Sequence, residues 1–414
     1  MKNIASLLFF ILFVFNSHSQ GLNLMSEDQL NELPELNDDT LGFVSNLPAS
    51  YSFEEYVPAV LTQSGASCVG FASQYYALST MYNIRLGIKE PSQKYSHAFD
   101  PYFVYSIVKS RDGENCDEGS NFAEAFDILK KAGARKMLFP PYLVCDSSWD
   151  KEKLSTTLPY TMPYSIDDWR YAKVNDEFIA TAKNALYNNF PLIFGVGLTD
   201  SFNSLSSDDS SSISSSSGLW EPKSYEDRLG GHALTIVGYD DYKFGGAFRV
   251  VNSWGREWGD NGYFWMKYSD FIDNVKAAFI MLIDENIGNG NPQINLDSYQ
   301  RVDYTNNFSM EGQYNSGSYN GYGIYHSDEN NTSYVGNFID GNMNGYFLML
   351  NNDGLYEANI RDGEMFDFDK LGFSDSDRET MKKSLMAKKY FKNLDSGNLL
   401  KKARSVKTIY VEKK

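Results

Sequence analysis

Cys68 is the residue whose type and surroundings most directly predict covalent chemistry. It follows a turn of small residues, Gly65 to Ser67, and a stretch of helical character runs from Ser73 to Tyr82. The thiol therefore falls at or near a helix N-terminus, where the aligned peptide dipoles favour a thiolate and lower the thiol pKa. Cys68 is a candidate nucleophile on this basis, and a buried structural cysteine is the alternative interpretation.

A thiolate nucleophile needs a neighbouring base, and the histidines narrow that choice. After residue 19 the histidines are His97, His232 and His326. His97 and His326 stand in polar segments, whereas His232 opens an apolar run that favours a β-strand. Asn252 follows a second apolar run, 248–251. Two neighbouring strands joined by a turn would place Asn252 beside His232.

These segments together resemble the papain-like cysteine peptidase family. The resemblance is carried by Cys68, by Gly231-His232-Ala233, and by Asn252-Ser253-Trp254-Gly255 with the segment Trp258 to Tyr263. It covers roughly residues 47 to 284 and implies a nucleophile at Cys68, a base and acid at His232, and an orienting side chain at Asn252. Such a triad hydrolyses peptide bonds through an acyl-enzyme.

The resemblance also implies the surroundings of the reacting groups. Gln63 would donate to the oxyanion together with the backbone N–H of Cys68. Trp254 would shield the hydrogen bond between Asn252 and His232 from water. The implied substrate-binding positions are Gly119, Ser120, Gly231 and Trp254.

Two departures from the family pattern concern the oxyanion loop and the substrate ledge. The loop from Gln63 to Cys68 is one residue shorter than usual and has a small residue in place of an inner cysteine, which leaves the reach of the Gln63 amide open. In the ledge at 116–120, Glu118 replaces the first of two glycines. This replacement predicts a negative side chain at the outer, non-primed side of the cleft.

The three cysteines cannot all pair within one chain, so an oxidising compartment leaves at least one thiol over. In the family, Cys116 and Cys145 each belong to a disulfide whose other half is missing here. They either pair with each other or stay free. No His or Cys cluster has zinc-ligand spacing, so neither a metal nor another cofactor is predicted.

Composition limits the class of protein. The chain has 414 residues, of which 42% are hydrophobic and 22% charged, and its net charge is −17. This length suits two or three domains, and the composition excludes a coiled coil, a collagen or a wholly disordered chain. The negative charge disfavours a nucleic-acid partner.

The first 19 residues predict a signal peptide: Lys2, an apolar run from Ala5 to Phe15, and small or polar residues to Ser19. A buried N-terminal helix is the alternative. No later apolar run is long enough to predict a transmembrane helix. We therefore expect export to the periplasm, the cell surface or the medium.

Residues 20–46 form a segment too short for the long helical pro-segment of lysosomal relatives, although a short blocking strand would fit. Residues 47–288 are expected to form an α+β peptidase domain with a helical lobe and a β-barrel-like lobe. Within it, the Ser-rich stretch 201–217 is expected to be a mobile loop. That loop is either a lid of the cleft or an insertion without function.

A short sequence motif is repeated within residues 295–368, and its copies begin at Gly312, Gly336 and Ala358. Glycine turns alternating with aromatic residues predict stacked β-hairpins, and the pattern resembles MORN-type repeats. These are either a structural spacer or bind a protein, glycan or surface partner. The basic tail 369–414 is expected to be solvated or to dock on an acidic or anionic surface.

The leading interpretation is an exported, two-domain cysteine peptidase that acts on peptide or protein substrates. One alternative is a secreted binding or scaffold protein with an inactive or weakly active peptidase fold, and another is acyl transfer to amines by the same groups. Because the family pattern ends near Asp284 and the repeats can stack on each other, the sequence predicts a peptidase core that is independent of residues 291–414.

Overall fold

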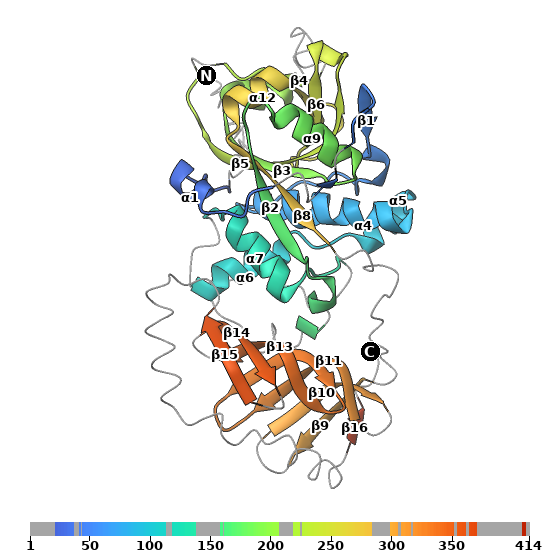
Figure 1. Cartoon of the computed structure of the whole chain (residues 1–414), viewed down its shortest axis with the longest axis vertical. Helices are drawn as coiled ribbons and strands as arrows, with labels where there is room; N and C mark the ends of the chain where they lie inside the picture. The colour runs from blue at the N-terminus through green and yellow to red at the C-terminus, as the bar shows by residue number, and fades with distance from the viewer. Residues whose placement is uncertain are drawn as a thin grey trace, which may run out of the picture.

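The computed structural model describes residues 21–36, 41–42, 44–112, 118–137, 158–159, 161–206, 218–223, 226–283, 299–304, 308–315, 318–351, 354–361, 364–370 and 408–410. The predicted signal peptide, Cys116, Cys145, and most of the Ser-rich stretch and the basic tail lie outside these residues. Three parts follow one another along the long axis of the molecule: a β-rich half, a helical half and a C-terminal sheet (Figure 1).

The helical half is built around one continuous helical run that starts at Cys68. The run comprises α3 (Cys68–Gly70), the π-helix η2 (Phe71–Leu78) and α4 (Ser79–Leu86). Gly70 and Ser79, which flank η2, both have right-handed helical backbone angles, so the direction of the chain is kept. Gly87, with a φ of 65°, ends the run in the left-handed conformation that glycine adopts without strain.

The described residues of this half form three further helices: α5 (Pro91–His97), α6 (Tyr102–Asp112) and α7 (Phe122–Ala132). In α7 the buried Phe122, Phe126 and Leu129 recur every three or four residues, which gives the helix one apolar face. The Asn121 side chain accepts a hydrogen bond from the Glu124 N–H and caps the helix. The cap fixes the start of α7 directly after the ledge.

The β-rich half is an eight-stranded sheet of order β2-β8-β3-β5-β6-β7-β4, with β1 paired to β5. Its strands are β1 (Ser50–Ser52), β2 (Asp168–Lys173), β3 (Leu192–Leu198), β4 (Leu219–Trp220), β5 (Gly230–Asp240), β6 (Ala247–Val251), β7 (Tyr263–Lys267) and β8 (Ala277–Leu282). The pairings are antiparallel except that of β4 with β7. Among the described strands, β2 and β4 are the two ends of this order, so the sheet is open where a barrel-like lobe was expected.

Short helices accompany the sheet: α9 (Phe178–Tyr187), α10 (Asp200–Asn203), α12 (Tyr268–Asn274), and the 3₁₀ turns η1 (Glu54–Tyr56), η3 (Met162–Tyr164), η4 (Ser204–Ser206) and η5 (Lys243–Gly245). Strands β5 and β6 are buried along almost their whole length. The Cys68 helical run contacts β5, and so does α9. Separate helices and a mainly antiparallel sheet agree with the predicted α+β class.

The C-terminal part is a second eight-stranded sheet of order β15-β14-β13-β12-β11-β10-β9-β16. Its strands are β9 (Tyr299–Tyr304), β10 (Phe308–Asn315), β11 (Ser318–Ser327), β12 (Thr332–Ile339), β13 (Asn342–Asn351), β14 (Gly354–Arg361), β15 (Glu364–Lys370) and β16 (Thr408–Tyr410). From β9 to β15 each strand is antiparallel to its neighbours in the chain.

The two faces of this sheet carry different rows of side chains. The residues that lie directly opposite one another on one face are Tyr325, Tyr334, Met349 and Tyr356. They belong to a cluster made by the sheet alone. The corresponding row on the other face is Ile324, Val335 and Leu348. This second row joins the apolar cluster of the helical half.

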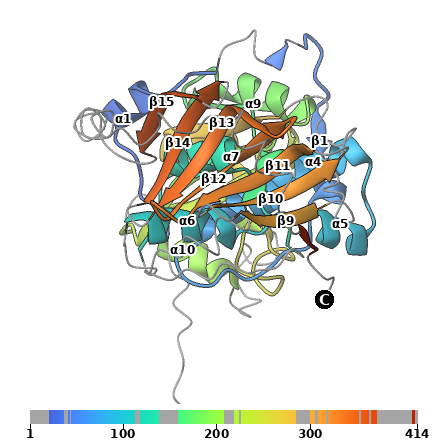
Figure 2. The ribbon, with the colours of Figure 1, turned by 90° about the horizontal axis from the view of Figure 1, so that it is seen from below.

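The sheet and the helical half therefore share one core. The sheet lies across the helical half in the view from below (Figure 2). At the end of α7, Lys131 forms an ion pair of 3.1 Å with Glu357 on β14. The prediction of an independent peptidase core is wrong for this reason: without the sheet, apolar side chains of the helical half would face water.

Candidate active site

Cys68 is completely buried at the start of the helical run, next to β5. The Thr235 hydroxyl on β5 donates to the carbonyl of Ala72 at 2.9 Å and ties the strand to this helix. The backbone N–H of Ala233, which follows His232, points at the Cys68 thiol. The thiol and the strand that carries the predicted base are thus neighbours.

Asn252 lies beside His232, as the two-strand prediction expects. Strands β5 and β6 are antiparallel, and the Nε2 of His232 is 2.8 Å from the Oδ1 of Asn252. The same oxygen accepts the Ser253 backbone N–H at 2.8 Å. The amide oxygen of Asn252 can only accept, so Nε2 carries the proton in this bond, and Nδ1 is the nitrogen through which neutral His232 can act as a base.

Aromatic rings surround this pair. The ring centroid of Trp254 is 5.2 Å from that of His232, and Phe202 of α10 is 5.1 Å from Trp254. Phe202 is completely buried and Trp254 is nearly so. Excluding water lowers the local dielectric constant and strengthens the bond between His232 and Asn252.

Gln63 is held on both sides of its amide. Its Oε1 accepts the Ser253 hydroxyl at 2.6 Å, and its Nε2 donates to the Gly65 carbonyl at 3.0 Å. The Gln63 backbone N–H also donates to the Ser253 carbonyl. The shortened loop is therefore anchored to the segment that follows Asn252, and one amide hydrogen of Gln63 is directed to its own loop.

The Cys68 thiol does not have the low pKa that the helix position predicts. Burial raises its pKa to about 11, and the backbone N–H groups of Ala233, Gly21 and Val69 oppose that rise only in part. The cause of the discrepancy is the complete removal of the thiol from water. In this conformation the group is a neutral thiol at neutral pH.

The N-terminal strap, residues 21–36, covers this thiol. Leu22 pairs antiparallel with Gly231 and parallel with Ser120, so the strap passes between them. The hydrogen bonds are Leu22 N–H to Gly231 O at 3.1 Å, Asn23 N–H to Ser120 O at 3.0 Å and Ser120 N–H to Gly21 O at 2.9 Å. Two predicted substrate-binding residues thus bind a segment of the same chain.

Glycines make this close approach of backbones feasible. A Cβ on Gly21 would lie 1.9 Å from the Ala66 carbonyl oxygen. A Cβ on Gly231 would lie 2.2 Å from the Leu22 oxygen, and one on Gly119 would lie 2.6 Å from the Gly21 oxygen. Contacts this short exclude a side chain at each position. Glu118, which belongs to the ledge, is exposed.

The strap has a second anchor further along. Between the anchors it forms α1 (Glu27–Asn31), which begins at a capping box of Ser26 and Gln29. The Tyr171 N–H donates to the Pro34 carbonyl at 2.9 Å, and the Leu36 N–H donates to the Tyr171 carbonyl at 2.7 Å. These bonds extend the sheet at its β2 edge, so the strap is fixed at the cleft and at the sheet edge.

Some residues of the site were not predicted. Tyr76, on the Cys68 helical run, donates to the backbone carbonyl of Asn252 at 3.0 Å. Phe202 lies at the start of the Ser-rich stretch 201–217, which was expected to be a mobile loop, but it is completely buried on α10. Its position as the one aromatic residue of that stretch was the signal available. For Tyr76 and for the path of the strap, local sequence gave no signal, because their partners are distant in the chain.

Comparison with known families agrees with this geometry. Residues 104–278 match the family described as papain family cysteine protease. His232 and Asn252 lie inside the matched range, and Cys68 lies before it. An uncharacterized peptidase C1-like protein of Acanthamoeba polyphaga mimivirus is 35% identical over 212 residues. That match spans 47% of this chain and 62% of the relative, less than two thirds of its length.

Solved structures with similarity include xylellain, a cysteine protease from Xylella fastidiosa, with a TM-score of 0.49 and 20% identity over 64% of this chain and 97% of that one. Procathepsin B S9 from Trypanosoma congolense has a TM-score of 0.46 and 17% identity, over 64% of this chain and 87% of that one.

In the part of the chain that the structure describes, no three His, Cys, Asp or Glu side chains are grouped to hold a metal ion. No described helix is long and apolar enough to span a membrane.

Proposed function

We propose that this protein is a cysteine peptidase that uses Cys68 as nucleophile, His232 as base and acid, and Asn252 to orient the imidazole. The observation that carries the proposal is the 2.8 Å bond between His232 and Asn252, on a strand that touches the buried Cys68. That bond leaves Nδ1 of His232 for the exchange of a proton with the thiol.

In the proposed reaction, the Cys68 thiol gives its proton to His232, and the thiolate attacks the carbonyl carbon of the scissile peptide bond. The negative charge on the carbonyl oxygen is stabilised by the Cys68 backbone N–H and the Gln63 amide. His232 then protonates the leaving amine, and a thioester remains. Water, deprotonated by His232, releases the acid and restores the thiol.

We propose further that the strap makes this peptidase latent. It occupies Ser120 and Gly231, the positions that a substrate would need, and it supports a raised thiol pKa by excluding water. Backbone hydrogen bonds of this kind are replaced by water at small net cost, so a substrate or the loss of the strap can open the cleft.

Export and the nature of the C-terminal sheet are parts of the same proposal. Residues 1–19 have the pattern of a signal peptide, which supports export. The repeated motif that begins at Gly312, Gly336 and Ala358 supports MORN-type repeats. The sheet has one face in the common core. A protein, glycan or surface partner would have to use its edges or loops.

The test is hydrolysis of a fluorogenic peptide library, with Cys68→Ala, His232→Ala and Asn252→Ala as variants. We expect Cys68→Ala and His232→Ala to abolish turnover, and Asn252→Ala to retain a small activity because Asn252 only orients the base. Mass spectrometry with an added amine distinguishes hydrolysis from acyl transfer. Unchanged hydrolysis by Cys68→Ala would end the assignment, and a chain that hydrolyses nothing even after residues 21–25 are removed would support a binding or scaffold protein.

A further inference from the structure

Tyr76 connects the elements that carry the reacting groups. It lies on the π-helix η2, in the same helical run as Cys68, and only 1% of it is exposed. Its hydroxyl donates to the backbone carbonyl of Asn252 at 3.0 Å and accepts the Leu61 N–H at 3.4 Å. One buried hydroxyl therefore joins the helix of the nucleophile to the segment after β6 and to the segment that leads to Gln63.

These two segments are also bonded to each other. Thr62 forms an antiparallel bridge with Trp254, and the Gly255 N–H donates to the Leu61 carbonyl at 3.2 Å. Such bonds keep the two segments together but do not fix them to the helical run. The Tyr76 hydroxyl adds that connection, and because its oxygen accepts one N–H, its proton is directed to the other segment.

The π-helical turns help to set the direction in which Tyr76 points. The Ser79 N–H donates to the Gln74 carbonyl, five residues earlier, and π turns of this kind are frequent at functional sites. A wider turn changes the direction of the side chains along it. The neighbouring Tyr75 is also completely buried, but its hydroxyl donates to the Ala59 carbonyl at 2.7 Å. Two adjacent tyrosines thus hold different parts of the chain.

The carbonyl that Tyr76 binds belongs to the residue that orients the base. The Oδ1 of Asn252 lies 2.8 Å from the Nε2 of His232, and it keeps this position only while the Asn252 backbone is fixed. Burial raises the pKa of Tyr76 well above its ordinary value. The phenol therefore keeps its proton and remains a donor at neutral and moderately alkaline pH.

We propose that Tyr76 is a positioning residue of this active site: by fixing the Asn252 backbone to the helix of Cys68, it holds the imidazole of His232 in its working orientation. The inference rests on the proposed peptidase function. Loss of the hydroxyl leaves a buried carbonyl without this partner, so the Asn252 side chain and the bond to His232 become looser.

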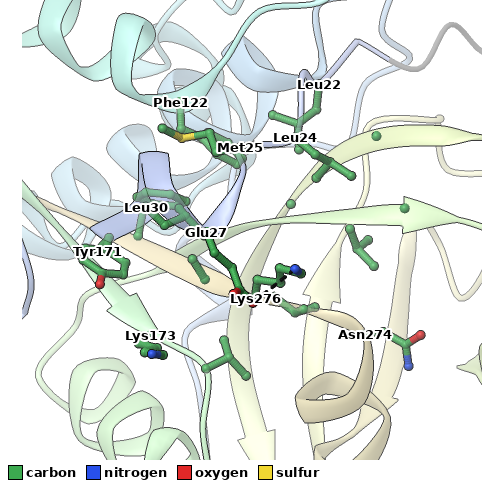
Figure 3. A pocket seen from close by; sticks show the side chains of 18 of the residues that line it. Leu22, Leu24, Met25, Glu27, Leu30, Phe122, Tyr171, Lys173, Asn274 and Lys276 are labelled. Atoms are coloured by element: carbon green, nitrogen blue, oxygen red, sulfur yellow. Dashed lines mark hydrogen bonds and ion pairs between the residues drawn. The ribbon is translucent and has the colours of Figure 1, made fainter. Parts of the chain in front are cut away.

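The space available to a substrate should not depend on Tyr76. A cavity of about 670 Å³ lies between the strap and strands of the β-rich half, with Phe122 on the helical side (Figure 3). Tyr76 is not among the described residues that line this cavity. Removal of its hydroxyl should therefore lower kcat and leave KM nearly unchanged.

The test is Tyr76→Phe, which removes only the hydroxyl. Its kcat for a fluorogenic peptide should fall about tenfold, because a small misplacement of the base is enough for such a loss. Added to Asn252→Ala, the same change should lower kcat less than about twofold further, because the side chain that it positions is gone. Tyr76→Met should show the same loss and covers the case in which phenylalanine prevents folding.

Tyr75→Phe is the matched control, because it removes a hydroxyl from the next residue of the same π-helix. The Ala59 carbonyl that it binds belongs to an exposed residue, and water can replace the lost donor. Tyr75→Phe should change kcat less than about twofold.

Two readouts distinguish a positioning role from a merely structural one. The Nε2 proton of His232, followed by NMR, should exchange with water at least about threefold faster in Tyr76→Phe, because its bond to Asn252 opens more often. That bond also favours the imidazolium, so loosening it lowers the His232 pKa. The alkaline limb of the pH profile of kcat should therefore move to lower pH in Tyr76→Phe and stay in place in Tyr75→Phe.

Unchanged kcat and unchanged exchange of the Nε2 proton in Tyr76→Phe overturn the inference while leaving the peptidase in place. An equal fall of kcat in Tyr75→Phe does the same, since it shows a general loosening of the helix. Failure of the proposed function is a different result: no peptide is hydrolysed by the native chain or by a chain without residues 21–25, and this inference falls with it.

Discussion

The N-terminal strap and the C-terminal sheet both pack against the helical half, but they differ in how much apolar surface they bury there. The strap is held in the cleft by backbone hydrogen bonds and by Leu22 and Leu30, which are buried in the apolar cluster of the helical half, whereas its Leu24 is 55% exposed. The sheet contributes Ile324, Val335 and Leu348, of which none is more than 6% exposed. This difference indicates which of the two segments separates more easily from the helical half.

Energies support this distinction. A backbone hydrogen bond that is exchanged for water contributes about 1 kcal/mol net, whereas burying a valine, leucine or isoleucine side chain contributes about 1.5 to 3 kcal/mol. Separating the sheet would expose a whole row of such side chains. The strap places Leu22 and Leu30 in the shared cluster, whereas the sheet places Ile324, Val335, Leu348 and Leu350 there, so the strap is the more easily displaced of the two.

The largest expected effect concerns the sheet. Leu348→Ala removes a completely buried side chain from the shared core and should lower the free energy of unfolding by about 2 to 5 kcal/mol. Ile339→Ala, at a 51% exposed position of the same sheet, is the control and should change it by less than about 0.5 kcal/mol. Denaturant unfolding measures both.

A shared core also predicts that Leu348→Ala lowers the protection of α7 amides from hydrogen exchange. If the amides of α7 keep their protection while only the sheet loosens, the two parts unfold separately, and the independent core expected from the sequence would be restored.

A smaller effect is expected at the strap. Gly21→Val places a side chain against the Ala66 carbonyl, and overpacking of this kind costs about 1 to 3 kcal/mol. The strap should leave the cleft more often, so that iodoacetamide alkylates Cys68 about tenfold to a hundredfold faster. Asn31→Val, at an exposed position of the strap, should have little effect. Equal alkylation rates for the two variants would mean that the strap does not control access.

The sequence predicted those parts of the site that depend on local pattern. His232 and Asn252 each adjoin an apolar run, and antiparallel pairing of two such runs is the simplest arrangement. The strap could not be predicted, because residues 21–25 have no pattern that specifies a distant partner. Its only trace was the length of the segment, which allowed a blocking strand.

The sequence does contain a signal for the shared core, although it was interpreted above as hairpins that stack only on each other. Residues 346–350 are apolar at consecutive positions, and a strand with this pattern is buried on both faces. Stacked hairpins that stand alone would need only one buried face. The second face, with Leu348, required a partner, and the helical half supplies it.

The most direct test of the account is the pH dependence of Cys68 alkylation in the native chain and in a variant that lacks residues 21–25. Thiolate is the reactive form, so the rate rises with pH towards the thiol pKa. The native chain should show a midpoint near the raised value of about 11. Without the strap, water and His232 should bring the midpoint below about 9, which at pH 7 is an increase of about a hundredfold in thiolate. Identical midpoints and rates in the two proteins would contradict a latent cysteine peptidase blocked by its own N-terminal segment.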